Sequence, residues 1–360
     1  METQLNKIEG AIDTKTIKAL VFLGTGKIEY RDVPKPMLVK TTDALVKIIK
    51  TTICGTDLGI LHGKTPSCKP GTTLGHEGVG VIEEIGSAIR NFKKGDHVII
   101  SCITSDGTCE YCKKQMYAHC EDGGWILGNT INGTQAEYVR IPHADNSLYP
   151  IPEGSDEEAL VMLSDILPTG YEIGVIDGGV KLGDTVAIVG AGPVGMSALL
   201  TAQFYSPAKI YVIDIDDSRL EMAKTFGATH TINSARENAK KRIFEETKDG
   251  VDVAIEAVGL SDTFNICQEI IRPGGHIANI GVHGVKVDLQ IERLWMQNIT
   301  LTMGLVNTNT THQLLKTVES GKLQPQKLIT HHFKLQEIVK AYEVFGNPKK
   351  ENALKIILTS

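Results

Sequence analysis

The sequence predicts an α/β protein in which a β-rich part is followed by a doubly wound parallel sheet. Up to about residue 152, short apolar stretches are separated by glycine-containing turns, a pattern typical of strands. From residue 153 onward, apolar stretches of strand length alternate with segments of helix length, which predicts parallel strands joined by right-handed crossovers. A chain of 360 residues is long enough for both domains.

The first domain is expected to follow a polar N-terminal extension, residues 1–16, and to comprise residues 17–165 and 306–360. Five apolar stretches predict its strands: 18–23 (KALVFL), 44–50 (ALVKIIK), 77–86 (EGVGVIEEIG), 96–101 (DHVIIS) and 136–141 (AEYVRI). Two helices and a closing strand are expected to return to this domain from the end of the chain: 312–321, 337–346 and 353–360.

The second domain is expected to comprise residues 166–305. Six apolar stretches predict its strands: 185–190 (TVAIVG), 209–214 (KIYVID), 228–232 (ATHTI), 251–259 (VDVAIEAVG), 275–281 (GHIANIG) and 299–304 (ITLTMG). Helical spacing over 196–205 and 218–227 predicts two of the helices between them, and Gly227 suits a helix C-terminus.

The composition excludes several classes of partner. Hydrophobic residues make up 41% and charged residues 22% of the chain, and the net charge of −6 indicates neither a nucleic-acid partner nor an anionic membrane. The chain shows neither a signal-peptide pattern nor an apolar run approaching the roughly 18 residues that span a bilayer. Seven cysteines, three of them at metal spacing, indicate reduced thiols and predict a cytoplasmic location.

A glycine-rich stretch, 189–195 (VGAGPVG), follows a predicted strand and opens a predicted helix, which is typical of a Rossmann dinucleotide site. The expected cofactor-binding residues are Gly190, Gly192, Pro193, Val194 and Gly195. The first glycine permits a tight turn, the second lets the backbone approach a pyrophosphate, and the third allows close packing of helix and strand. The phosphate is expected at the unpaired N–H groups of the helix N-terminus.

An aspartate ends the second strand of this domain. A carboxylate at Asp214 accepts hydrogen bonds from the adenosine ribose and repels a 2′-phosphate, which favours NAD over NADP. The alternative is that Asp214, Asp216 and Asp217 only cap the next helix; we assign the cap to Asp216 or Asp217. Arg219 is a further candidate, because it could meet a phosphate.

Three cysteines, Cys109, Cys112 and Cys120, have the spacing Cys-x2-Cys-x7-Cys, which is typical of a metal site. A tetrahedral site needs a fourth ligand. Asp106 lies three residues before Cys109 and extends the spacing, and Cys102 is the rival candidate.

Three further residues can each bind zinc: Cys54 in TICGTD, His76 in GHEGVG and Asp165 in LSDILPTG. Singly, each is more simply explained as a buried thiol, a core histidine or a helix cap. No spacing rule groups residues so far apart.

The stretch 75–89 (GHEGVGVIEEIGSAI) matches the signature Gly-His-Glu-x2-Gly-x5-Gly-x2-Ile, and the other motifs follow in a consistent order. The chain thereby resembles the zinc-dependent medium-chain alcohol dehydrogenases. Aspartate at position 165 is similar to the bacterial secondary-alcohol branch. The resemblance implies a GroES-like β-rich catalytic domain, a Rossmann domain that binds NAD, and two zinc ions, one catalytic and one structural.

The resemblance also implies the roles of the site residues. Cys54, His76 and Asp165 hold the catalytic zinc, which binds the oxygen of a small alcohol or carbonyl substrate, and Glu77 takes the open position when no substrate is bound. Thr56 passes the alcohol proton to the cofactor. The structural zinc of the family lies among four cysteines, the first of which is replaced here by Asp106; this register favours Asp106 over Cys102.

The chain departs from the family where a histidine often continues the proton relay, because that position is Gly59. His62 or water is the replacement. Trp125 is either a pocket residue or simply packed. The alternatives to the alcohol dehydrogenase are a polyol or amino-alcohol dehydrogenase, a zinc-free reductase and a non-catalytic protein of the same fold. The resemblance also implies a homodimer or a homotetramer, in which strand 299–304 is a candidate for pairing across a two-fold axis.

Overall fold

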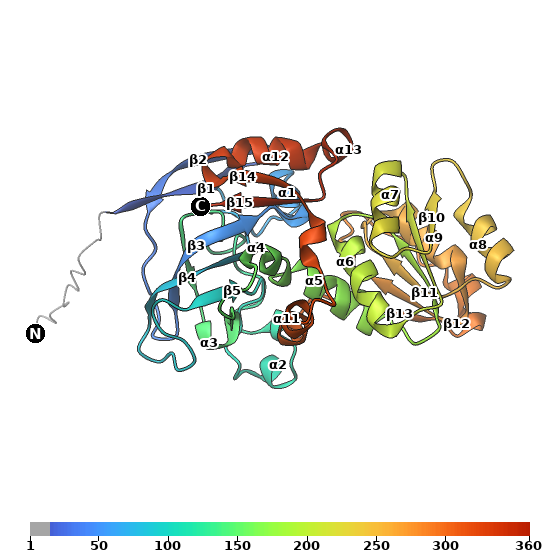
Figure 1. The fold of residues 1–360 in the computed structure, drawn as a ribbon, viewed down its shortest axis with the longest axis horizontal. Coiled ribbons are helices and arrows are strands. Elements are labelled where there is room, and N and C mark those ends of the chain that lie inside the picture. The colour runs from blue at the N-terminus through green and yellow to red at the C-terminus, as the bar shows by residue number, and fades with distance from the viewer. Residues whose placement is uncertain (1–14) are drawn as a thin grey trace, which may run out of the picture.

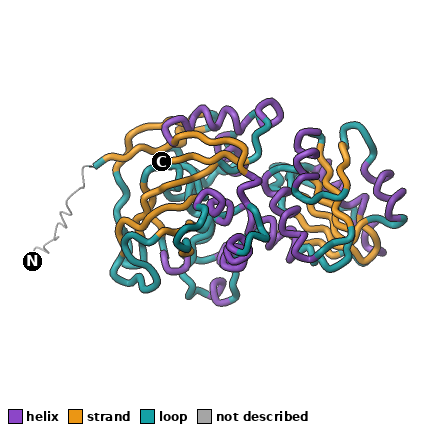
Figure 2. The backbone as a smooth tube through the Cα atoms, in the orientation of Figure 1, coloured by secondary structure: helices purple, strands orange, loops and turns teal. Residues whose placement is uncertain are grey.

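A computed structural model describes residues 15–360, and the fold consists of a seven-stranded sheet, a six-stranded sheet and a two-stranded ribbon. Figure 1 shows the two large sheets at opposite ends of the molecule, with α5 and α6 between them. The same division is seen in Figure 2, where strands form two separate groups. The predicted N-terminal extension lies outside the described residues except for its last two, and the first strand already begins at Thr16.

The seven-stranded sheet is built from both ends of the chain. Its order is β14-β15-β3-β4-β5-β7, with β6 paired to β3, while β1 and β2 form the ribbon. The strand bounds are β1 (Thr16–Gly24), β2 (Lys27–Pro34), β3 (Ala44–Thr52), β4 (Gly78–Ile85), β5 (His97–Ile100), β6 (Tyr138–Ile141), β7 (Leu148–Pro150), β14 (Ile329–Lys334) and β15 (Lys355–Thr359). The closing strand therefore pairs with β3 near the start of the chain.

The pairing of β3 with β4 positions the first metal-binding candidates. These strands are antiparallel, with Thr51 opposite Gly78. Continuing this register past both strand ends would place Ile53 opposite His76, so Cys54, the next residue, lies close to His76. Short helices connect the strands of this domain: α1 (Gly55–Leu61), α2 (Glu110–Lys113), the 3-10 turn η1 (Tyr117–His119) and α3 (Ala144–Ser147).

The predicted doubly wound parallel sheet is confirmed. Its order is β10-β9-β8-β11-β12-β13, and every pair of neighbours is parallel. The strands are β8 (Thr185–Val189), β9 (Lys209–Asp214), β10 (His230–Asn233), β11 (Val251–Glu256), β12 (Ile271–Asn279) and β13 (Thr300–Met303). The order reverses direction between β8 and β11, and a cofactor binds at such a switch point, outside the carboxyl ends of the strands.

Helices connect the parallel strands and the two sheets. Those of the parallel sheet are α6 (Pro193–Ala202), η4 (Gln203–Tyr205), α7 (Asp217–Thr225), α8 (Ala239–Thr247), α9 (Ser261–Ile270), α10 (Ile291–Leu294) and η5 (Trp295–Gln297). The chain passes from the seven-stranded sheet to the parallel sheet through α4 (Glu157–Leu160), η2 (Val161–Leu163), α5 (Ile166–Thr169) and a π-helical turn, η3 (Gly170–Ile176). The return runs through α11 (Thr311–Glu319), η6 (Pro325–Leu328), η7 (Leu335–Glu337), α12 (Ile338–Gly346) and α13 (Pro348–Glu351).

One hydrophobic core crosses the junction of the two sheets. It contains Val79 and Ile357 of the first sheet, Leu163 and Leu167 of the connecting helices, and Val186 of the parallel sheet. Packing of this kind fixes the two parts against each other. The predicted domain boundaries near residues 165 and 305 stay predictions.

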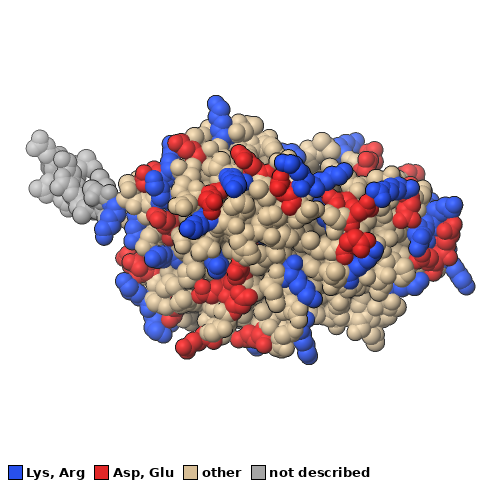
Figure 3. Space-filling model, turned by 45° about the horizontal axis from the view of Figure 1, so that its top comes forward, with Lys and Arg blue, Asp and Glu red and all other residues tan. Residues whose placement is uncertain are grey.

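The surface and the cysteines agree with an ordinary globular composition. On most of the face drawn in Figure 3, basic and acidic side chains are interspersed. All seven cysteines are free thiols in the described residues. The cytoplasmic location stays a prediction.

Within residues 15–360, no single helix is long and apolar enough to cross a membrane. The bent pair Glu157–Leu163 and Ile166–Ile176 passes that test by length and composition when the two segments are taken together.

Candidate metal and cofactor sites

Four side chains that can bind a metal meet at the edge of the first sheet that faces the connecting helices. Cys54 directly precedes α1, His76 and Glu77 directly precede β4, and Asp165 directly precedes α5. One ligand atom from each lies within 4.8 Å of the others. The fold thus brings together the residues that sequence spacing alone could not group.

The separations of these atoms fit a tetrahedral zinc ion. Asp165 Oδ2 lies 3.2 Å from His76 Nε2 and 3.8 Å from Cys54 Sγ. Zinc bonds of about 2.0–2.3 Å place neighbouring tetrahedral ligands about 3.3–3.8 Å apart. Thiolate, imidazole and carboxylate are also the donor types that zinc takes in proteins. The residues present therefore fit the metal that the donor set indicates.

A buried carboxylate supports the histidine from behind. Asp57 Oδ1 lies 3.6 Å from His76 Nδ1, while Asp57 Oδ2 accepts hydrogen bonds from the backbone N–H of Cys54 at 2.9 Å and from Gln135 Nε2 at 3.1 Å. A carboxylate that faces the outer nitrogen of a metal-binding histidine fixes the ring orientation. Asp57 therefore orients His76 so that Nε2 faces Asp165 and Cys54.

The local charges favour a cation at this cluster. Burial alone would lower the pKa of His76, but its hydrogen bond with Asp165 and the negative charges of Cys54 and Asp57 outweigh burial and raise the pKa. The same surroundings stabilise a metal ion, because it replaces the proton among the same acidic groups.

The residues assigned to proton transfer lie on or next to α1. Thr56 is half-buried in the first turn of this helix, close in the chain to Cys54. A Cβ added at Gly59 would meet nothing within 4 Å, so the position expected for a relay histidine is open space. His62 is exposed at the end of the helix.

Trp125 lies beside the cluster. Its ring centroid is 6.2 Å from that of His76, in an edge-to-face arrangement. The indole Nε1 is buried and has no hydrogen-bond partner among the described residues. Trp125 therefore forms part of the apolar surroundings of the metal-binding residues.

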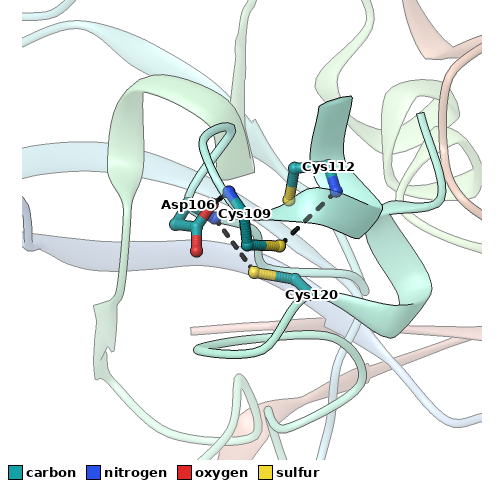
Figure 4. A group of neighbouring side chains, drawn as sticks. All are labelled: Asp106, Cys109, Cys112 and Cys120. Carbon is teal, nitrogen blue, oxygen red and sulfur yellow. Dashed lines mark hydrogen bonds between the residues drawn. The ribbon is translucent and has the colours of Figure 1, made fainter. Parts of the chain in front are cut away.

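The second cluster is the loop that contains α2 and η1. Figure 4 shows the side chains of Asp106, Cys109, Cys112 and Cys120 directed toward one another, and their ligand atoms lie within 4.8 Å of each other. Backbone N–H groups already point at the sulfurs: Asp106 N lies 3.2 Å from Cys120 Sγ, and Cys112 N lies 3.5 Å from Cys109 Sγ. Such N–H···S contacts stabilise thiolates, the form that binds metal.

Asp106 is held in place as an ionised group. Its Oδ1 accepts a hydrogen bond from the backbone N–H of Cys109 at 2.8 Å. Burial would raise the pKa of Asp106, but hydrogen bonds from the backbone of Thr108 and Cys109 outweigh it and hold the pKa well below its usual range. Cys102 lies elsewhere, packed with Ile103 and Val306, so the structure places Asp106 with the three cysteines and Cys102 apart from them.

The glycine-rich loop has the geometry that a dinucleotide requires. Gly190 has a φ of +107°, which favours glycine. A Cβ on Gly195 would lie 1.9 Å from the carbonyl oxygen of Gly190, whereas a Cβ on Gly192 would meet nothing within 4 Å. The loop is therefore tight between its first and third glycines and open at the second. Pro193 begins α6, with Val194 beside it in the first turn.

Asp214 ends β9 next to this loop. Its Oδ2 accepts a hydrogen bond from the backbone N–H of Ala191 at 2.7 Å, and its Oδ1 accepts from Ile215 and Asp216. The carboxylate thus lies against the glycine-rich loop. Asp216 caps α7 by accepting from Ser218 N, as predicted, and Arg219 is half-buried on that helix.

Comparison with known proteins gives a consistent result. Residues 40–153 match the model of the alcohol dehydrogenase GroES-like domain, and residues 193–320 match that of the zinc-binding dehydrogenase. An alcohol dehydrogenase from Cupriavidus necator is 35% identical, covering 96% of this chain and 99% of the relative. This chain belongs to the zinc-dependent medium-chain alcohol dehydrogenase family.

Solved structures of the family agree with this fold. Zinc-dependent alcohol dehydrogenase 2 from Streptococcus pneumonia, in its apo form, is 56% identical with a TM-score of 0.92, over 96% of this chain and 98% of that one. A zinc-binding dehydrogenase from Sinorhizobium meliloti 1021, bound to NADP, is 27% identical with a TM-score of 0.86, over 96% of this chain and 100% of that one. The predicted family and fold class are confirmed.

Sequence reasoning missed two residues that complete the site of this dehydrogenase. Asp57 stands in the CGTD string, but its contact with His76 depends on how the chain turns at α1. Lys355, on the closing strand, is fully buried and contacts Glu77 at 2.7 Å. A lysine within a strand otherwise as apolar as KIILT was the available signal, because a buried lysine needs an acidic partner.

We expect Asp106→Ala to lower the metal content from about two zinc ions per chain to about one. Three thiolates would remain with one open position, so the loop would bind zinc weakly and the melting temperature would fall. Asp106→Cys should restore both metal content and melting temperature. Cys102→Ala is the matched control and should keep both ions. Metal analysis with melting curves decides; loss of one ion from the Cys102→Ala protein would identify Cys102 as the fourth ligand.

Proposed function

We propose that this protein is an NAD-dependent alcohol dehydrogenase that transfers hydride reversibly between a small secondary or primary alcohol and NAD, giving a ketone or an aldehyde. The observation that carries the proposal is the convergence of Cys54, His76 and Asp165 at tetrahedral separations. Family membership supports alcohol oxidoreduction, and the glycine-rich loop supports a nicotinamide cofactor.

Each residue of the cluster has a distinct part in this proposal. Cys54, His76 and Asp165 would hold zinc, which supplies Lewis-acid polarisation of the substrate oxygen when bound. Thr169 Oγ1 donates to Asp165 Oδ1 at 2.6 Å and so fixes the carboxylate rotamer. Thr56 would relay the alcohol proton, because its hydroxyl oxygen can accept that proton while its own proton passes to the cofactor ribose, and the open space at Gly59 would let water carry the proton onward.

The wall beside the metal-binding residues favours a small alcohol over a polyol. Trp125 presents a large aromatic ring next to His76. An aromatic wall gives a polyol few hydrogen-bond partners for its additional hydroxyl groups, whose desolvation would then be uncompensated. A polyol or amino-alcohol substrate is the alternative within the same family.

We propose NAD as the cofactor because of the carboxylate of Asp214. This group lies against the glycine-rich loop, where the ribose of a bound dinucleotide is expected, and would repel a 2′-phosphate. The Sinorhizobium meliloti relative, whose structure contains NADP, makes the choice of cofactor a question for experiment.

His76→Ala should lower turnover with a simple alcohol by at least about a thousandfold, because the metal loses a ligand. NADH binding, followed by its fluorescence, should change by less than about twofold, since the nucleotide loop belongs to the other sheet. Cys54→Ser should behave likewise. His312 is an exposed histidine on α11, and His312→Ala is the control. Near-normal turnover in the His76→Ala protein would contradict the proposed ligand set.

Asp214→Gly should lower the ratio of kcat/KM for NAD to kcat/KM for NADP by at least about tenfold, because the repulsion of the 2′-phosphate is removed. Asp217→Ala, at an exposed position a few residues further along, is the matched control and should leave the ratio unchanged. The assignment fails if the unaltered protein already prefers NADP.

We also propose a homodimer or a homotetramer with β13 at an interface. This strand is at the edge of the parallel sheet, and Trp295, Met296 and Met303 near it are large, apolar and exposed. An edge strand with such residues is suited to antiparallel pairing across a two-fold axis. Met303→Asp should lower the mass measured by sedimentation, whereas Leu182→Asp, a control at an equally apolar exposed site, should not. A monomeric unaltered protein would refute the proposal.

A further inference from the structure

Lys355 is the one lysine or arginine among the fully buried residues of the part of the chain that the structure describes. It is the first residue of β15, and its Nζ donates hydrogen bonds to Glu77 Oε2 at 2.7 Å and to the carbonyl oxygen of Ile53 at 3.2 Å. Ile53 precedes Cys54, and Glu77 follows His76. The ammonium group is therefore attached to both segments that carry the metal-binding residues.

The environment of this lysine is acidic. Burial would lower the pKa of Lys355, but the negative charges of Glu77, Cys54 and Asp165 outweigh burial and raise the pKa. Moving an ammonium group out of water costs several kcal/mol unless it is paired and hydrogen-bonded. The desolvation cost of the Lys355 ammonium group must therefore be offset by the acidic groups around it.

The partner of this lysine is itself a candidate metal ligand. A carboxylate oxygen of Glu77 lies within 4.8 Å of ligand atoms of Cys54, His76 and Asp165. Glu77 Oε2 is bound to Lys355, while Glu77 Oε1 is buried without a hydrogen-bond partner among residues 15–360. The carboxylate thus contacts the ammonium group and also lies beside the ligand atoms of Cys54, His76 and Asp165.

We propose that Lys355 is a positioning residue that holds Glu77 by one oxygen and so keeps this carboxylate from becoming a permanent fourth ligand of the metal. The proposal rests on the proposed function, because it takes Cys54, His76 and Asp165 as the ligands of a metal with one open position. Without the ammonium group, the carboxylate loses its partner, and the metal is the nearest remaining cation. Glu77 would then close the position that a substrate oxygen needs.

The test uses the full-length protein loaded with Co2+ and titrated with imidazole. Imidazole binds a metal only where a coordination position is open. Asp106 and the three cysteines of the loop would fill all four positions of their metal, so the difference spectrum reports only the metal held by Cys54, His76 and Asp165. Lys355→Met should weaken imidazole binding by at least about tenfold, the usual effect of removing a group that hydrogen-bonds to a residue at a metal site. Lys355→Arg should keep the affinity within about threefold, because the positive charge remains.

A double variant separates positioning from general stability. Lys355→Met combined with Glu77→Gln removes both charges, and the neutral amide of glutamine is a poor ligand for Zn2+ or Co2+. This protein should bind imidazole with the affinity of the unaltered chain, even where Lys355→Met alone fails to fold. Lys50→Met is the matched control, since Lys50 contacts Thr359 of the same closing strand without touching Glu77.

The outcomes are distinct. Unchanged imidazole affinity in folded Lys355→Met protein, or a tenfold loss in the double variant, overturns the role of Lys355. Absence of any imidazole difference spectrum in the unaltered, Co2+-loaded protein instead overturns the proposed metal centre itself.

Discussion

Buried charge between the first sheet and the connecting helices is the constraint on which the rest of the structure depends. Asp57, Glu77 and Lys355 are almost completely removed from water there. Each buried ion costs several kcal/mol unless partners surround it. The partners come from the end of β3, the start of β4, the start of α5 and the start of β15. These segments are distant in sequence, so the charges are compensated only when the chain has closed its first sheet with the last strand.

Another buried carboxylate, that of Glu172, binds the segment by which the chain returns from the parallel sheet. Glu172, on the π-helical turn after α5, accepts hydrogen bonds from the backbone N–H groups of Asn307, Thr308 and Thr310. Thr308 has a φ of +62°, which is rare for a β-branched residue. The three N–H bonds to one carboxylate, and the bond from Tyr149 to the Thr308 carbonyl at 2.8 Å, stabilise this backbone. The junction is therefore fixed by polar contacts as well as by the shared core.

The features that the sequence predicted well are local. The glycine-rich loop, the apolar strands and the cysteine spacing each lie within a short stretch, so their patterns could be recognised directly. Glu77 and Lys355 are separated by 278 positions, and neither sits in a spacing that points to the other. The grouping of Cys54, His76 and Asp165 came from a family resemblance for the same reason. What the sequence could not predict is the set of contacts that appears only when sheet register and chain return are known.

The loop that contains α2 and η1 is connected to the segment of Asp165 through residues 307–310. Asn307 Oδ1 accepts from the backbone N–H of Ala118 at 3.0 Å, and Asn309 Nδ2 donates to the Gln115 carbonyl at 3.0 Å, so two side chains of this segment anchor the loop. Glu172 binds that segment and lies in the helical stretch that begins after Asp165. The loop buries few apolar side chains of its own, and a metal would supply much of its folding free energy. A metal in the loop would therefore also stabilise the segment that binds Glu172. Because Glu172 lies on the helical stretch that begins after Asp165, the same metal would help to fix the position of Asp165. Under the proposed function, the loop would support the arrangement of Cys54, His76 and Asp165 from a distance, without contributing an atom to the reaction.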